Sequence, residues 1–329
     1  MKRARARFRR NRLAVASGVF LIVALLVAFA ALPFSLSWYE VQDLQRAVRA
    51  APTTGQIVPY ESVQDPLQSN PLASPFKRWG PAAHTGAAWF GYDEVGRSVL
   101  FRLVLGWLVS MGIGLGAAAI SVTIGVLWGT AAALAGGRTD SLMMRMVDIL
   151  YGLPYILLVI LLKVGLERPL TRGFGDRASL ANVVILFVAI GAVSWLTMAR
   201  VVRGQVLSLR EQPFMEAARA AGVGPVRVFW RHLLPNLIGP IVVYATLIIP
   251  QAILQESFLS FLGIGIQRPL PSLGQLAADG VQAVNTFVGF WWLITFPCAA
   301  LVLTLLALNF LGDGLRDALD PKSAEAPMI

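Results

Sequence analysis

Histidine and cysteine are scarce in this sequence, and their scarcity limits the chemistry that the chain can perform. Cys298 is the single cysteine among 329 residues, so no disulfide can form within the chain. Because Cys298 lies inside an apolar run, we expect it to be a small buried hydrophobic side chain. The two histidines, His84 and His232, are far apart, and no His-Glu-x-x-His pattern is present. We therefore predict no metal site and no other cofactor.

The sequence also lacks the patterns that usually carry catalysis. No lysine follows a glycine, which excludes a Gly-Lys-Ser/Thr phosphate loop for ATP. No Gly-x-Ser-x-Gly turn is present to display a nucleophilic serine. Asp93 and Glu94 are adjacent acids, but neighbouring side chains point in different directions on a helix, so they are not expected to act as an acid–base pair. We predict no catalytic residues and a chain that is not an enzyme.

Charged residues are few, and apolar residues are abundant. Only 14% of the residues are charged, 56% are hydrophobic, and the mean hydropathy is +0.66. Several apolar runs exceed the ~18 residues that a helix needs to cross a bilayer. The alternating segments of about ten residues that are typical of a transmembrane barrel are absent. We predict an all-α, polytopic membrane protein with six transmembrane helices.

The order of apolar and polar runs divides the chain into segments. The predicted segments are a basic tail at 1–12, a first span at 13–33, a long extracytoplasmic loop at 34–97, a five-helix core at 98–313 with a charged hairpin at 211–236, and a polar tail at 314–329. Prolines interrupt most of the loop, although 38–50 could form a short amphipathic helix. Six spans put both termini on one side, and the basic residues near the first span and in the hairpin place that side in the cytoplasm.

The same charge bias accounts for much of the net charge of +10, so this charge does not indicate nucleic-acid binding. We favour a retained first helix over a cleaved signal peptide, because the apolar run is long and its end is a poor cleavage site. A DNA- or lipid-binding role of the basic tail is the alternative.

Glycine spacing predicts close helix packing inside the core. Gly112 and Gly116, and likewise Gly125 and Gly129, follow the small-xxx-small spacing that lets membrane helices approach closely. We expect these glycines to pack within the bundle rather than to form a dimer motif.

The third span is predicted as one helix over 141–164, with Thr139 or Asp140 as its cap. Arg145 and Asp148 are three residues apart in this helix and share a face, so we expect them to pair. They lie close to the cytoplasmic end, which favours a structural role over a functional one.

The segment 211–236 is a charged interruption between two long apolar runs. Pro213 suits the first turn of a helix, and Gly222 suits the left-handed position just past its end. Apolar residues recur between them at i, i+3, i+4 and i+7, namely Phe214, Ala217, Ala218 and Ala221. A second amphipathic run follows and ends at Pro235. We predict two short helices at the membrane surface that present a small-residue face to a partner.

This hairpin resembles the Glu-Ala-Ala motif of ABC-importer permeases. Glu216-Ala217-Ala218 is followed after three residues by Gly222, and after nine more by a sequence that ends in Leu-Pro. The general motif has a hydrophobic residue at position 232. His232 departs from it, and together with Arg231 and Asn236 it is similar to the peptide branch of these permeases.

Further stretches resemble the same dipeptide, oligopeptide and nickel branch, and most of all its oligopeptide permease C subunits. These stretches are 91–100, 193–205, 256–265, 271–274 and 309–321. Tyr92 and Ser98 depart from the family pattern in the first of them. The resemblance covers nearly the whole chain except the loop around 35–88.

The resemblance implies a non-catalytic permease subunit in a prokaryotic inner membrane. It would pair with a homologous permease subunit, two ATP-binding-cassette ATPase subunits and an extracytoplasmic solute-binding protein. The residues that it implies for ATPase coupling are Glu216, Ala217, Ala218, Ala221 and Gly222. The implied cargo is a peptide, and a nickel chelate or another small solute is the alternative. The resemblance implies no particular substrate-binding residues.

Two functions of other classes compete with this interpretation. An ion-coupled secondary transporter would need inverted repeats and ionisable groups at mid-membrane depth, and neither is recognisable in the sequence. A membrane-embedded hydrolase would need a Ser/His, Asp/Asp or metal-ligand arrangement within the spans, and none is found.

Overall fold

A computed structural model describes residues 8–9, 11–50, 90, 93, 98–174, 178–266, 270–283 and 290–319. Most of the predicted basic tail and most of the predicted loop at 34–97 lie outside the described residues. The last ten positions of the predicted C-terminal tail also lie outside them. Of the stretch 91–100, only Asp93 and 98–100 are described.

The regular elements of the described residues are all helical, which confirms the all-α class. The elements are α2 (Arg12–Ala50), α4 (Val99–Ala135), α5 (Gly137–Tyr151), α6 (Tyr155–Phe174), α7 (Ala178–Arg210), α8 (Pro213–Ala220), α9 (Pro225–Val228), the π-helix η4 (Phe229–Leu233), α10 (Leu234–Phe261), α11 (Leu273–Ala283) and α12 (Trp291–Leu319). Five helices in the described part are long and apolar enough to cross a membrane, and a sixth span results if the bent pair α5 and α6 counts as one.

The first helix is longer than its apolar run predicts. α2 continues from Arg12 to Ala50, whereas we expected a span that ends at Pro33 and a separate short helix at 38–50. A proline removes one main-chain hydrogen bond, but a helix can continue past it, and the amphipathic stretch that follows has helical periodicity of its own. The apolar portion that could span a bilayer is still only Arg12–Leu32.

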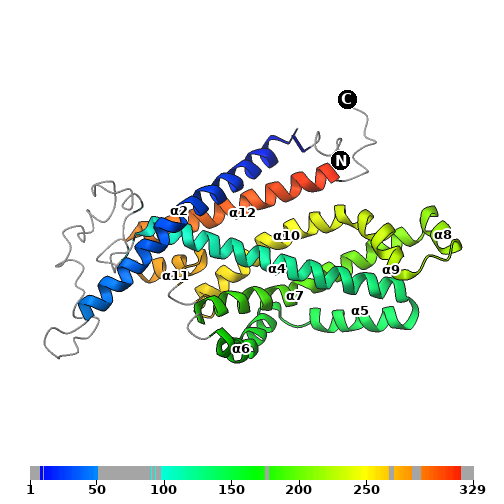
Figure 1. The fold of residues 1–329 in the computed structure, drawn as a ribbon, viewed down its shortest axis with the longest axis horizontal. Coiled ribbons are helices and arrows are strands. Elements are labelled where there is room, and N and C mark those ends of the chain that lie inside the picture. The colour runs from blue at the N-terminus through cyan, green and yellow to red at the C-terminus, as the bar shows by residue number, and fades with distance from the viewer. Residues whose placement is uncertain are drawn as a thin grey trace. The chain divides into compact units, whose positions relative to one another are not determined.

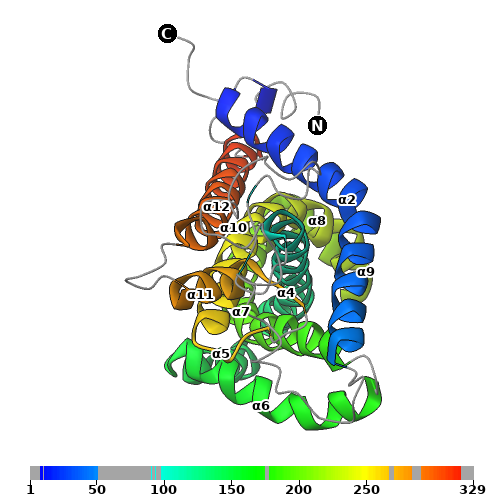
Figure 2. The same ribbon diagram turned by 90° about the vertical axis from the view of Figure 1, so that its left-hand side faces the viewer.

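The third span is not the single straight helix that we expected at 141–164. α5 ends at Tyr151, α6 begins at Tyr155, and the two helices are bent by 93°. Figure 2 shows α6 lying across the view, whereas α5 runs along the line of sight behind it. Gly152 and Pro154 explain the break, because glycine weakens a helix and proline disfavours helical geometry in the residue before it. α6 then continues to Phe174, beyond the predicted end of the third span at 164.

The contacts divide the chain into two compact units, which we describe separately. Unit 1 comprises Met1–Leu21, Met111–Gln255 and Thr304–Ile329. Unit 2 comprises Ile22–Ser110 and Glu256–Leu303.

Close packing of α4 on α7 forms the centre of unit 1, where Figure 1 shows α4, α5 and α7 side by side. A Cβ atom on Gly125 would lie 2.5 Å from the Cβ of Met198, and one on Gly129 would collide with the carbonyl oxygen of Ala199. These glycines therefore pack within the bundle, as predicted. Gly112 differs, because a Cβ atom there would meet nothing within 4 Å.

Aromatic side chains contribute much of the core of unit 2. Phe290, Trp292 and Leu293 are buried together with Val99 of α4. Phe90 stacks on Phe296 with the ring centroids 4.4 Å apart. These contacts fix the first turns of α12 and α4 against one another within this unit.

Candidate coupling hairpin and polar clusters

The predicted hairpin consists of two short helical arms between α7 and α10 in unit 1. The first arm is α8, and the second is α9 with η4, which continues into α10. Both arms lie together at the right-hand end of Figure 1, beyond the ends of α7 and α10. α8 begins at Pro213 and the chain breaks at Gly222, so both predicted boundaries are confirmed.

Gly222 ends the first arm through its backbone conformation. Its φ is +67°, in the left-handed region where a side chain is strained. The N–H of Val223 donates to the carbonyl of Ala218 at 3.1 Å, which is the six-residue hydrogen bond of a Schellman motif with glycine at C′. A Cβ atom on Gly222 would meet nothing within 4 Å, so the glycine is needed for conformation and not for space.

The two sides of α8 face different surroundings, which corrects the single apolar face that the sequence predicts. Met215 and Ala218 are 1% and 6% exposed, respectively. Glu216, Ala217 and Ala221 are exposed, as is Gly222. Met215 belongs to the core cluster that joins α7, α9, η4 and α10, and burial of this large side chain sets the rotation of α8. Ala218 therefore packs inward and supports the hairpin from within its own chain.

A π-turn sets which residues of the second arm are buried. Val228 and Leu233 are both buried although they are five residues apart, a spacing that a π-helix brings onto one face. The N–H of Leu234 accordingly donates to the carbonyl of Phe229. Trp230 lies on the other side and is 64% exposed.

Two arginines of α7 bind aspartates of α5 near the hairpin. Arg203 pairs with Asp140, and Arg200 donates to Asp148 at 2.9 Å. The predicted pair of Arg145 with Asp148 is therefore wrong, because the partner of Asp148 comes from a helix far along the chain. Neither predicted cap forms a side-chain cap hydrogen bond for α5, since Asp140 is turned towards Arg203 instead.

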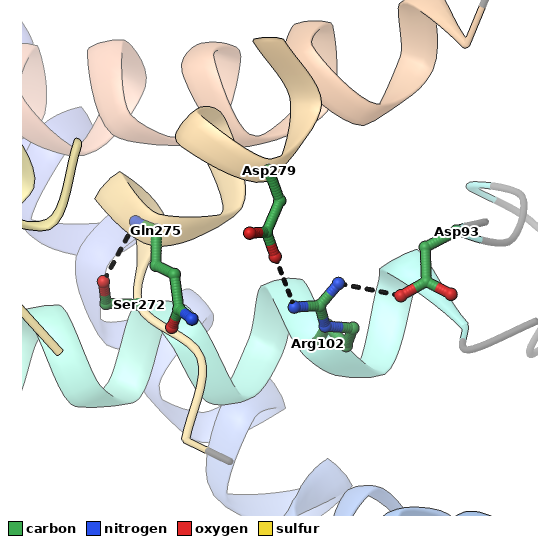
Figure 3. Close-up of polar contacts among 5 residues, drawn as sticks. All are labelled: Asp93, Arg102, Ser272, Gln275 and Asp279. Carbon is green, nitrogen blue, oxygen red and sulfur yellow. Dashed lines mark hydrogen bonds and ion pairs between the residues drawn. The ribbon is translucent and has the colours of Figure 1, made fainter. Parts of the chain in front are cut away.

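Arg102 bridges two carboxylates in unit 2. Its Nη1 donates to Asp93 at 2.8 Å, and its Nη2 donates to Asp279 of α11 at 2.9 Å. Figure 3 shows the guanidinium between the two aspartates. The side chain of Arg102 is 9% exposed, so this charge depends on its partners.

α11, the helix that contains Asp279, has a capped N-terminus. The N–H of Gln275 donates to Ser272 Oγ, which makes Ser272 the N-cap of α11.

Glu256 is a buried acidic residue of unit 2 that we did not predict as part of a site. It is 0% exposed and accepts hydrogen bonds from Ser110 Oγ at 2.8 Å and Ser260 Oγ at 2.7 Å. Ser110 Oγ in turn accepts from the N–H of Leu273 at 3.1 Å, so the Glu256 side chain and Ser110 connect α4, α10 and α11. The signal that could have revealed Arg102 and Glu256 is an ionisable residue next to a long apolar run. Within the described ranges, no group of three or more His, Cys, Asp or Glu side chains could hold a metal ion.

Two family models match the chain. The model described as "Binding-protein-dependent transport system inner membrane component" matches residues 121–325, which is more than half of the sequence. The model described as "N-terminal TM domain of oligopeptide transport permease C" matches residues 1–52.

Curated relatives are similar over nearly the full length. The oligopeptide transport system permease protein OppC of Haemophilus influenzae is 41% identical, with 97% of this chain and 88% of the relative covered. OppC of Escherichia coli K12 is 40% identical, with 97% and 90% covered. The dipeptide transport system permease protein DppC of Bacillus subtilis is 46% identical over 71% of this chain and 68% of the relative.

The solved structures support the fold. A chain of the inward-facing MetNI methionine ABC transporter matches with a TM-score of 0.51 at 21% identity, covering 67% of this chain and 97% of that one. At this identity the match shows the fold alone. Together with the family model and the relatives, it leads to one conclusion: the chain belongs to the binding-protein-dependent transport system inner membrane components, the multi-pass permease subunits of ABC importers.

Proposed function

We propose that this chain forms one half of the pathway by which a peptide crosses the membrane, and that its hairpin couples the pathway to an ATPase. The cargo is inferred from relatives that are named oligopeptide and dipeptide permeases. A homologous permease subunit would form the other half of the pathway, and an extracytoplasmic solute-binding protein would supply the peptide. Both termini and the hairpin would lie in the cytoplasm, in accordance with the charge bias of the sequence.

The observation that carries the coupling role is the exposed side of α8. Glu216, Ala217 and Ala221 are exposed beside the left-handed Gly222. Small side chains let another protein surface approach the helix closely, and Glu216 adds a charge that a basic partner group can bind. With eight residues, α8 is about 12 Å long, which suits a groove on one ATPase subunit.

The inner side of α8 would carry the motion. Met215 packs in one core cluster with Val206 of α7, Leu233 of η4 and Leu237 of α10. Because a close-packed cluster resists deformation, a displacement of α8 would move the ends of α7 and α10 with it. The hairpin would thus act as a lever, and its residues would transmit a movement that ATP hydrolysis in another subunit produces.

Substitution of the exposed alanines tests this role in a complex co-expressed with its partner permease and ATPases. Ala217→Trp and Ala221→Trp should leave the permease folded and inserted but reduce ATPase co-purification and ATP-driven peptide uptake at least tenfold. Ala131→Trp, at an exposed alanine of α4, is the matched control and should retain both activities. Normal co-purification and uptake by both hairpin variants would refute the coupling role.

Ala218→Trp separates docking from folding. Ala218 is 6% exposed, so a large side chain there should overpack the hairpin and lower the yield of folded protein. A fully folded Ala218→Trp permease that fails only to bind the ATPase would contradict the inward orientation of this residue.

A further inference from the structure

Two glutamines interrupt the apolar surface of α10 in unit 1. Gln251 and Gln255 are four residues apart and therefore lie on one face of the helix. Gln251 is exposed and Gln255 is half-buried, although both belong to the candidate span Val226–Phe261. An amide that faces hydrocarbon loses its hydrogen bonds to water at a cost of several kcal/mol. This face of α10 is therefore suited to a polar surrounding within the membrane.

A tyrosine holds the second glutamine in place. The hydroxyl of Tyr155 donates to Gln255 Oε1 at 2.6 Å and lies 3.0 Å from Ser194 Oγ. Tyr155 is the first residue of α6, directly after the 93° bend, and Ser194 belongs to α7. Since the amide oxygen accepts from Tyr155, the orientation of the amide is set, and its NH₂ group, which lies in the same plane as the oxygen, points away from the tyrosine hydroxyl.

All three residues of this polar group belong to candidate membrane spans. Ser194 is the middle residue of α7, which is a candidate span from Leu180 to Arg210. Tyr155 and Gln255 lie at the same depth as Ser194, because short hydrogen bonds join the three side chains. All three side chains are half-buried within this chain, so the group reaches the surface of unit 1 instead of being enclosed by it.

We propose that Gln251 and Gln255 line the translocation pathway and form hydrogen bonds with the main chain of the passing peptide, with Tyr155 as a positioning residue for Gln255. The inference rests on the peptide importer function proposed above. A carboxamide both donates and accepts hydrogen bonds, so it can bind the C=O and N–H groups that every peptide carries. Leu254 lies beside Gln255 and is 55% exposed, and this mixture of polar and apolar groups suits peptides of varied side chains.

Cysteine accessibility tests the position of Gln251. Cys298 is the single cysteine and is half-buried, so Cys298→Ser provides a background for Gln251→Cys. In the reconstituted complex, a charged, membrane-impermeant thiol reagent should modify Gln251→Cys, and a transported peptide should slow the reaction severalfold. Leu115→Cys is the control, since Leu115 is 50% exposed in the apolar span α4 and should react poorly, without peptide protection.

The other outcomes overturn the proposal. Modification that peptide does not slow would place Gln251 in water but away from the substrate. Modification only when the partner permease is absent would show that Gln251 contacts that subunit. A complex without substituted glutamines that transports no peptide would instead refute the proposed cargo, so the two failures are distinguishable.

Transport kinetics test the hydrogen bonds. Gln251→Leu and Gln255→Leu should each raise the half-saturating peptide concentration about threefold to tenfold, the effect of one lost hydrogen bond, with normal ATPase binding. Tyr155→Phe should show a smaller rise in the same parameter, whereas Tyr151→Phe, at an exposed tyrosine, should have no effect. Unchanged half-saturation in both leucine variants would contradict peptide contact at these positions.

Discussion

Arg203 donates two hydrogen bonds to Asp140, from Nε to Oδ1 and from Nη2 to Oδ2, both at 2.6 Å. The two residues are 63 positions apart and join α7 to α5. A parallel pair of this kind restricts both side chains at once, and the carboxylate is only 12% exposed. It holds α5 against α7, which is one of the two helices from which the hairpin extends.

Loss of this pair should destabilise the permease. Arg203→Gln leaves Asp140 mostly buried without its cation, and we expect a loss of about 1–3 kcal/mol in unfolding free energy. Arg200→Gln is the matched control on the same helix. The side chains of Arg200 and Asp148 are 41% and 63% exposed, respectively. Removal of this pair should therefore change the free energy of unfolding by only about 0.5 kcal/mol. Apparent melting temperatures of the purified variants in detergent measure the difference, and equal shifts would contradict the distinction.

The left-handed Gly222 should tolerate substitution less well than its neighbour. Gly222→Ala forces a Cβ atom into a φ of +67° and should cost about 1–2 kcal/mol of local stability, whereas Gly222→Asn should be milder. Gly224 has no positive φ and open space around it, so Gly224→Ala is the control.

We expect peptide uptake per bound ATPase to fall in the order Gly224→Ala, Gly222→Asn, Gly222→Ala. If Gly222→Ala keeps full uptake while Gly224→Ala loses it, the backbone argument fails.

Arg102 should be indispensable for the folding of unit 2. Its removal takes from two carboxylates the cation that they share, and breaking a buried ion pair costs about 3–5 kcal/mol. We expect Arg102→Gln to be degraded or to aggregate. Arg102→Lys keeps the positive charge but lacks the planar guanidinium that binds both carboxylates, so it should restore part of the folded protein.

The amount of monodisperse permease in solubilised membranes measures this effect. Arg145→Gln, at an exposed arginine, is the control and should accumulate normally. Normal accumulation of Arg102→Gln would show that the bridge carries little stability.

The glycines of α4 provide a prediction about packing. Gly129→Val would push a side chain into the main chain of α7 and should prevent stable folding. Gly112→Val, in open space on the same helix, should have only a small effect. Thermal unfolding of the two purified variants compares them, and similar melting temperatures would contradict the close approach of α4 and α7.

Single residues and short patterns in the sequence were enough to predict the ends of α8 and the all-helical class. Pro213 and Gly222 mark the boundaries of α8 because proline lacks an N–H and glycine accepts a positive φ, and both properties belong to single residues. The break of the third span was likewise present in the sequence as Gly152 and Pro154. We nevertheless predicted one helix over 141–164.

The sequence by itself determined a polytopic helical chain, a capped hairpin and a family resemblance that the comparisons confirm. Tertiary structure alone decided that Ala218 faces inward and that Asp148 pairs with Arg200. It also decided that Tyr155 joins Gln255 across one hundred positions. Periodicity fixes which residues share a face of a helix, but it does not specify which neighbour that face meets. The packing of whole helices determines that neighbour. Burial of a large side chain such as Met215 contributes more free energy to this packing than burial of a single alanine does.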